Sequence, residues 1–158
     1  MNFDKFFDQI SDRTTEINIS EFSFNDSYLL NNEALFQLPL ISLIILVLAK
    51  DRRKPRVSEV GQLVGESIEE SLVGFKGSAQ HIGWSANLRV RTVKAITFLE
   101  AAQLIVVNNR KSKINITALG KKVIKKAMLN EDDLAYNLAV IARSYRNICV
   151  SRQLDLEL

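Results

Sequence analysis

The side chains best suited to chemistry in this sequence are cations, and they gather in its middle. Residues 50–126 carry 16 basic and 6 acidic groups, residues 1–49 carry 2 and 7, and residues 127–158 carry 3 and 5. Lys and Arg neutralise phosphate, and Arg also pairs with guanine through two hydrogen bonds. A basic block between acidic ends therefore favours contact with double-stranded DNA, and an ordinary solvated surface is the alternative.

Eight of these cations are the candidate DNA contacts. They are Arg91 and Lys94 on a predicted helix, Arg110, Lys111 and Lys113 at a predicted hairpin tip, and Arg52, Arg53 and Lys54 after an apolar run. On the helix, Arg91 and Lys94 lie opposite the expected core face, whereas Arg89 is predicted to point closer to the buried side. Three cations on a short turn repel one another unless an anion is near, so the hairpin tip is the stronger candidate.

Hydrophobic periodicity predicts the elements that position these cations. A nearly all-apolar helix over residues 33–50 would be central, and a short helix capped by Ser58 and closed by Gly65 would follow it. A longer helix buries a face from Leu88 to Ala102 and ends near Gln103. Two further helices are expected, one capped by Thr117 and running to about residue 128, and one with apolar positions from residue 134 to 148.

Between the third and fourth of these helices the sequence predicts a β-hairpin. The stretch 104–107 is apolar and β-favouring, residues 108–113 are polar and basic, and residues 114–116 alternate as a half-buried strand does. The strands 104–107 and 114–117 are expected to pair antiparallel, with the basic residues at the tip.

The order of helix, short helix, longer helix, hairpin and helix resembles a winged helix-turn-helix domain. The resemblance is closest over residues 92–123, and the residues that carry it are Leu99, Ala102, Leu104, Ile105, Ile116, Thr117 and Gly120. We therefore predict a mostly α fold with a small β-hairpin wing: a winged helix-turn-helix core in residues 31–130, an N-terminal amphipathic segment and connection in 1–30, and a C-terminal helix and tail in 131–158. The chain departs from the usual pattern because about 20 residues separate Val64 from Ser85.

Both ends of the chain are candidate partner-binding segments. Phe3, Phe6, Phe7 and Ile10 recur at the spacing of one helix face, and Leu154, Leu156 and Leu158 alternate with polar residues as in a half-buried strand. The N-terminal stripe must bury either on a partner or on this chain's own core, and the sequence leaves both open.

Composition argues against several other classes of protein. One cysteine and one histidine do not make a disulfide framework or a four-ligand zinc site, and they indicate a reducing, cytoplasmic setting. The apolar run 38–49 is too short for the roughly 20 residues that cross a bilayer, and no signal peptide is expected at the N-terminus. His81 and Cys149 look like packing residues, so we expect no catalytic site, no metal and no cofactor.

The whole-chain layout resembles the small middle components of bacterial three-component systems built on an ABC ATPase, including Lamassu-type anti-phage complexes. The residues that carry this resemblance are Asn31 to Leu35 at the start of the apolar helix, the enlarged connection before the third helix, and Leu88 to Leu99. It implies a non-enzymatic subunit that joins an SMC-like or Rad50-like ATPase to an effector nuclease, its winged helix serving as adapter, DNA contact or both. The alternative is a stand-alone winged-helix transcriptional regulator that binds DNA as a homodimer.

Overall fold

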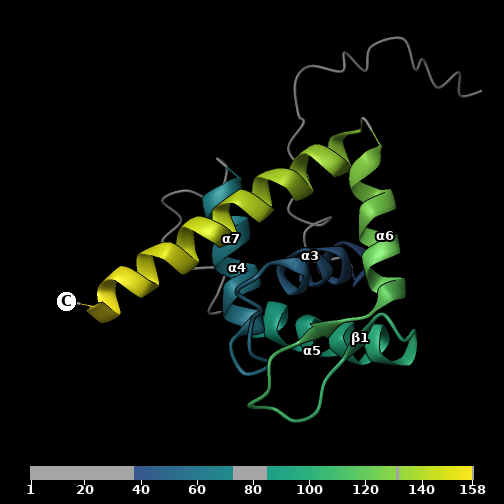
Figure 1. Cartoon of the computed structure of the whole chain (residues 1–158), viewed down its shortest axis with the longest axis horizontal. Helices are drawn as coiled ribbons and strands as arrows, with labels where there is room; N and C mark the ends of the chain where they lie inside the picture. Colours follow the sequence, from purple (N-terminus) through teal and green to yellow (C-terminus); the bar gives the residue numbers. More distant parts are fainter. Residues whose placement is uncertain (1–37, 73–84, 131, 158) are drawn as a thin grey trace, which may run out of the picture.

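The computed structural model describes residues 38–72, 85–130 and 132–157 (Figure 1). Residues 155–157 are described by their backbone alone. The elements are α3 (Leu38–Lys50), α4 (Val60–Ser71), α5 (Ala86–Ala101), β1 (Ile105–Val106), β2 (Asn115–Ile116), α6 (Ala118–Leu129) and α7 (Asp133–Glu157). The described part is mostly helical with a small antiparallel sheet, which confirms the coarse fold prediction. No helix in this part is both long and apolar enough to pass through a membrane. The division into residues 1–30, 31–130 and 131–158 stays a prediction.

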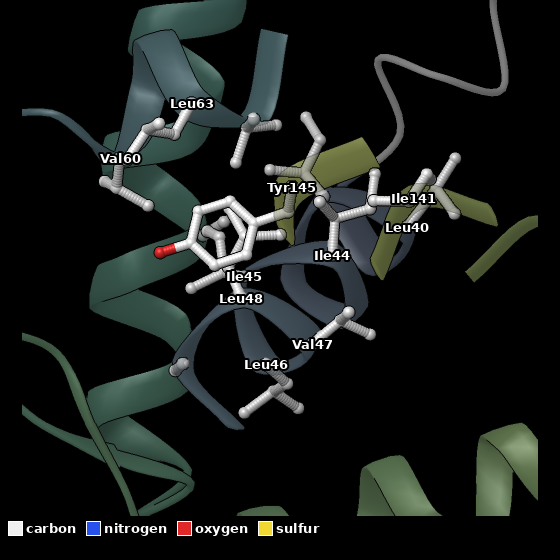
Figure 2. Close-up of a cluster of buried hydrophobic side chains, with 14 of the residues drawn as sticks. Leu40, Ile44, Ile45, Leu46, Val47, Leu48, Val60, Leu63, Ile141 and Tyr145 are labelled. Carbon is white, nitrogen blue, oxygen red and sulfur yellow. The ribbon is translucent and has the colours of Figure 1, made fainter. Parts of the chain in front are cut away.

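Helix α3 is the centre of the core, as its composition predicts. Every residue from Leu40 to Ala49 except Leu43 is buried, and the helix packs against α5, α6, α7 and β2. Figure 2 shows its side chains among Val60 and Leu63 of α4 and Ile141 and Tyr145 of α7. Each such buried aliphatic side chain contributes about 1.5–3 kcal/mol, so α3 supplies a large share of the stability.

The hairpin forms as predicted. Ile105 pairs with Ile116 and Val106 with Asn115, antiparallel, and Ile105 is 2% exposed. A third short stretch lies beside β2, where the sequence predicts no strand: Arg56 and Lys113 form an isolated antiparallel bridge, and the amide of Ile114 donates to the carbonyl of Pro55 at 3.0 Å. Pro55 is tolerated here because an edge position uses its carbonyl and needs no N–H.

The turn from α5 into β1 is a left-handed helix end. Gln103 has φ of 57°. The amide of Leu104 donates to the carbonyl of Leu99 at 2.9 Å, and the amide of Gln103 donates to the carbonyl of Glu100 at 2.9 Å. This double hydrogen bond is the Schellman arrangement, which usually carries glycine at the left-handed position. The helix therefore ends where the sequence predicts, but through a glutamine.

Helix α4 is longer than predicted. It begins at Val60 after Glu59 with no side-chain cap, so Ser58 is not its cap, and Gly65 is buried inside the helix and does not close it. The helix continues to Ser71 because it packs along α7, a contact that local sequence does not reveal. The connection to α5 therefore spans residues 72–85 and is shorter than the insertion predicted after Val64; residues 73–84 lie outside the described part.

Helix α7 corrects the prediction for the C-terminus. The chain is helical to Glu157, so the strand predicted from Leu154, Leu156 and Leu158 is wrong for its described residues, and Leu158 lies outside them. Two side-chain contacts hold this end in place: Arg152 pairs with Glu66 of α4 at 2.6 and 2.9 Å, and Gln153 accepts from Arg53 at 2.9 Å. The predicted core positions hold: Leu138, Ile141, Tyr145 and Ile148 are buried. Figure 1 shows α7 running diagonally across α4.

Candidate nucleic-acid interface

The hairpin tip presents its cations on a defined turn. Arg110, Lys111 and Lys113 are all exposed. The Asn109 side chain accepts from the amide of Lys111 at 2.9 Å, and the hydroxyl of Ser112 donates to the carbonyl of Asn109 at 2.7 Å. Such side-chain to backbone bonds fix a turn locally. The tip therefore holds three positive charges close together, as the sequence predicts.

The third stretch brings further cations to the base of the wing. The ammonium of Lys54 donates to Oδ1 of Asn115 on β2 at 2.8 Å. Arg56 is exposed, and its backbone pairs with that of Lys113 in the isolated β-bridge. Arg56 was not among the predicted site residues, although the basic run that contains it was the visible signal. We call Lys54, Arg56, Arg110, Lys111 and Lys113 the wing cluster.

The two arginines before Lys54 point to different uses. Arg52 is exposed. Arg53 instead faces α7: its guanidinium donates to Gln153 at 2.9 Å, and its carbonyl accepts a hydrogen bond from the Tyr145 hydroxyl. A guanidinium already paired with a side chain must give up that contact to bind phosphate. Of the predicted group Arg52, Arg53 and Lys54, the structure places only Lys54 in contact with the wing.

The remaining candidate cations lie on α5, the helix that packs against β1. Lys94 is exposed, and Arg91 is half-buried with its Nε donating to Oδ1 of Asn87 at 3.3 Å. The predicted core face is confirmed, with Leu88, Thr92, Ala95, Ile96 and Leu99 buried. Arg89 corrects the prediction, because it is exposed; a β-carbon on Gly61 would lie 3.7 Å from its Cγ, so the stem of Arg89 lies along α4.

A largely apolar stripe runs along the solvent side of α5. Ala86, Val90, Val93, Thr97 and Ala101 are exposed and three or four residues apart, so they form one stripe along the helix. We call this set the outer stripe. Val90 is 55% exposed and Val93 63% exposed, and the Thr97 hydroxyl donates to the carbonyl of Val93. Apart from Thr97, these side chains offer no hydrogen bond to a base edge.

Cys149 and Tyr145 lie together near the end of the core. Burial raises the pKa of the Cys149 thiol and that of the Tyr145 phenol, and the two side chains share a hydrogen bond. A raised pKa lowers the thiolate fraction on which cysteine nucleophilicity depends. Within residues 38–72, 85–130 and 132–157, no three His, Cys, Asp or Glu side chains come together as metal ligands would.

The candidate partner-binding residues are only partly described. Phe3, Phe6, Phe7 and Ile10 lie outside the described residues. Leu154 is 56% exposed on α7, and Leu156 belongs to the same helix.

Comparison with protein-family models, with curated proteins and with solved structures finds no match for this chain.

Proposed function

We propose that the region around α3, α4, α5 and the hairpin is a winged helix-turn-helix domain. Its support is the order of elements: a helix, a short extended stretch at residues 55–57, two helices, and the two hairpin strands. The stretch between the first two of these helices pairs with the hairpin, where Arg56 forms an antiparallel bridge with Lys113. The winged-helix resemblance of residues 92–123 points the same way.

We propose further that this domain contacts double-stranded DNA through its wing, without strong sequence preference. The observation that carries this proposal is the wing cluster, which draws cations from two distant segments onto one small sheet. Phosphate contacts by Lys and Arg give affinity for any duplex, and they weaken steeply with salt because bound counterions are released.

The role we propose is that of an adapter subunit. The outer stripe of α5 supports it over a stand-alone transcriptional regulator, because four of the five side chains of the stripe cannot hydrogen-bond a base edge. The proposed partners, an SMC-like or Rad50-like ATPase and an effector nuclease of a Lamassu-type defence system, rest on the family resemblance alone. In this proposal the subunit is cytoplasmic, has no catalytic activity and needs no cofactor, and its N-terminal stripe binds a partner subunit.

Fluorescence anisotropy with a random-sequence duplex tests the DNA contact. Replacing Arg110, Lys111 and Lys113 with Glu should weaken binding and reduce the slope of log K against log salt by about one unit per lost phosphate contact. A matched control changes Lys126, Arg143 and Arg146 to Glu; these three are exposed and lie on α6 and α7. Equal weakening by the control would mean that net charge alone drives binding, and unchanged binding by the wing variant would place the interface elsewhere.

Two outcomes separate the adapter from the regulator. Selection of bound duplexes from a random pool should return no consensus for the adapter, whereas a regulator would return a two-fold symmetric motif. Deleting residues 1–12 should leave a folded protein that no longer co-purifies with its ATPase from the native host. A truncated protein that keeps every partner would contradict the proposed role of the N-terminal stripe.

A further inference from the structure

The outer stripe of α5 is an apolar surface with nothing covering it among the described residues. It lies opposite the buried face and extends over the 16 residues of the helix, about 24 Å at 1.5 Å per residue. Phe98, which is 51% exposed, lies farther round the helix, beyond Lys94. A contiguous apolar surface on a helix is typical of a site that receives another helix.

The surroundings of the outer stripe are basic. Helical geometry places Arg89 on one side and Lys94 on the other, with Arg91 beyond Lys94. Glu100 is the single acidic residue of α5. An occupant that complements this surface needs an apolar face bordered by carboxylates.

The chain itself contains such a segment. We propose that in the free protein residues 3–12 lie on the outer stripe of α5. At helical spacing Phe3, Phe6, Phe7 and Ile10 make one face; Asp4 lies beside that face, next to Phe7, and Asp8 lies farther round on the same side. The proposal concerns this chain alone, and neither DNA binding nor a partner subunit is needed for it.

The tether is long enough. Residues 13–37, 25 in all, connect the segment to Leu38, and a random chain of 25 residues has an average end-to-end distance of about 25–30 Å, at 5–6 Å times the square root of the residue number. Helix α3, which begins at Leu38, packs against α5. Because the segment belongs to the same chain, its docking is intramolecular, and effective concentrations in such cases reach the order of millimolar, so a modest apolar contact suffices.

A second copy of the chain fits this surface less well. Two single helices packed together bury much less than the roughly 1,200–2,000 Å² of a stable interface. Two α5 helices would also bring Arg89, Arg91 and Lys94 of each copy together, with only Glu100 to offset them. The tethered segment avoids both costs.

Paramagnetic relaxation enhancement measures this contact in the full-length protein. Cys149 is the single cysteine, so Cys149→Ala with Ser11→Cys allows one nitroxide label beside the segment. We expect the backbone amides of Val90 and Val93 to lose most of their intensity, while those of α6 keep it. Broadening confined to another element would overturn the proposal.

Two further samples make the test specific. The first is a mixture of nitroxide-labelled protein without ¹⁵N and ¹⁵N-enriched protein without the nitroxide, in which the α5 amides should stay unbroadened. Broadening there would show that a second copy is the occupant and would overturn the proposal. Val93→Glu, at a position 63% exposed, should abolish the effect at α5, whereas the control Val106→Glu, at a position 50% exposed on β1, should not. An unchanged broadening pattern with Val93→Glu would also overturn it.

Discussion

The hydroxyl of Tyr145 donates a hydrogen bond to the backbone carbonyl of Arg53, a residue 92 positions earlier in the sequence. Tyr145 lies on α7 and is 1% exposed, and Arg53 lies just before the stretch that pairs with the wing. The C-terminal helix therefore fixes the chain between α3 and the base of the wing, and so positions the wing cluster.

Removing this hydroxyl should destabilise the protein. Tyr145→Phe leaves the carbonyl of Arg53 without its donor, and a buried unsatisfied group costs about 1–3 kcal/mol. Urea unfolding followed by circular dichroism measures the loss. The control Tyr136→Phe changes a side chain that is 63% exposed and should be close to neutral. Equal stability of the Tyr145→Phe protein and the parent would mean that the bond contributes nothing.

The same phenol predicts an alkaline component of stability. Burial raises the pKa of Tyr145 in the folded protein, so the neutral form is favoured there and the unfolded chain ionises first, near its ordinary value of about 10. This contribution is complete below about pH 10 and is lost as the pH rises above it. Plotted from pH 8 to about 11.5, the difference in unfolding free energy between parent and Tyr145→Phe should shrink. A constant difference would show that the phenol does not ionise on unfolding.

A charge in the hairpin seam should unfold the wing. Ile105 is 2% exposed and pairs with Ile116, so Ile105→Asp buries a carboxylate without a partner and should cost about 3 kcal/mol or more. The neighbouring Val106→Asp is the matched control, because Val106 is 50% exposed, and its cost should be below about 1 kcal/mol. Thermal melts of the two variants compare these costs directly, and similar melting temperatures would contradict the assignment of Ile105 to the core.

Two glycines should respond in opposite directions to the same substitution. A β-carbon on Gly120 would overlap the carbonyl oxygen of Leu104 and lie 2.8 Å from Cγ1 of Ile116, so Gly120→Ala should destabilise by more than about 1 kcal/mol. Gly61 lies in α4 with its nearest atom at 3.7 Å, an ordinary contact, so Gly61→Ala should stabilise by about 0.5–1 kcal/mol. Chemical denaturation of both variants tests the pair, and stabilisation by Gly120→Ala would contradict the close approach of α6 to the hairpin.

Features encoded locally could be predicted from the sequence. The hydroxyl of Thr117 accepts from the amide of Gly120 at 3.0 Å, as its place before α6 predicts, and the core faces of α5 and α7 follow from their periodicity. The candidate cations at the hairpin tip are exposed for a similar reason, since a short polar turn between two apolar strands has no core to enter.

The sequence-based predictions fail where distant segments meet. Residues 55–57 form an extended stretch because β2 offers a partner, which a proline in a basic run does not indicate. Gly65 stays helical because α4 packs along α7, and Leu154 is helical although it lies in an alternating pattern. The sequence does not mark Arg56 as a site residue for the same reason: its neighbour Lys113 is far away in sequence.

The hairpin is anchored at its base, which leaves the length of its loop free to vary. Thr117 donates to the carbonyl of Gln103 at 2.8 Å, and the pairs of Ile105 with Ile116 and of Val106 with Asn115 close the loop that follows. With both ends held, extra residues at the tip disturb the local bonds of Asn109 with Lys111 and Ser112 but leave these strand pairs in place, and the loop entropy that they add is about 0.6 kcal/mol for each doubling of loop length. The reach of the wing can therefore be lengthened or shortened almost independently of the stability of the helical body.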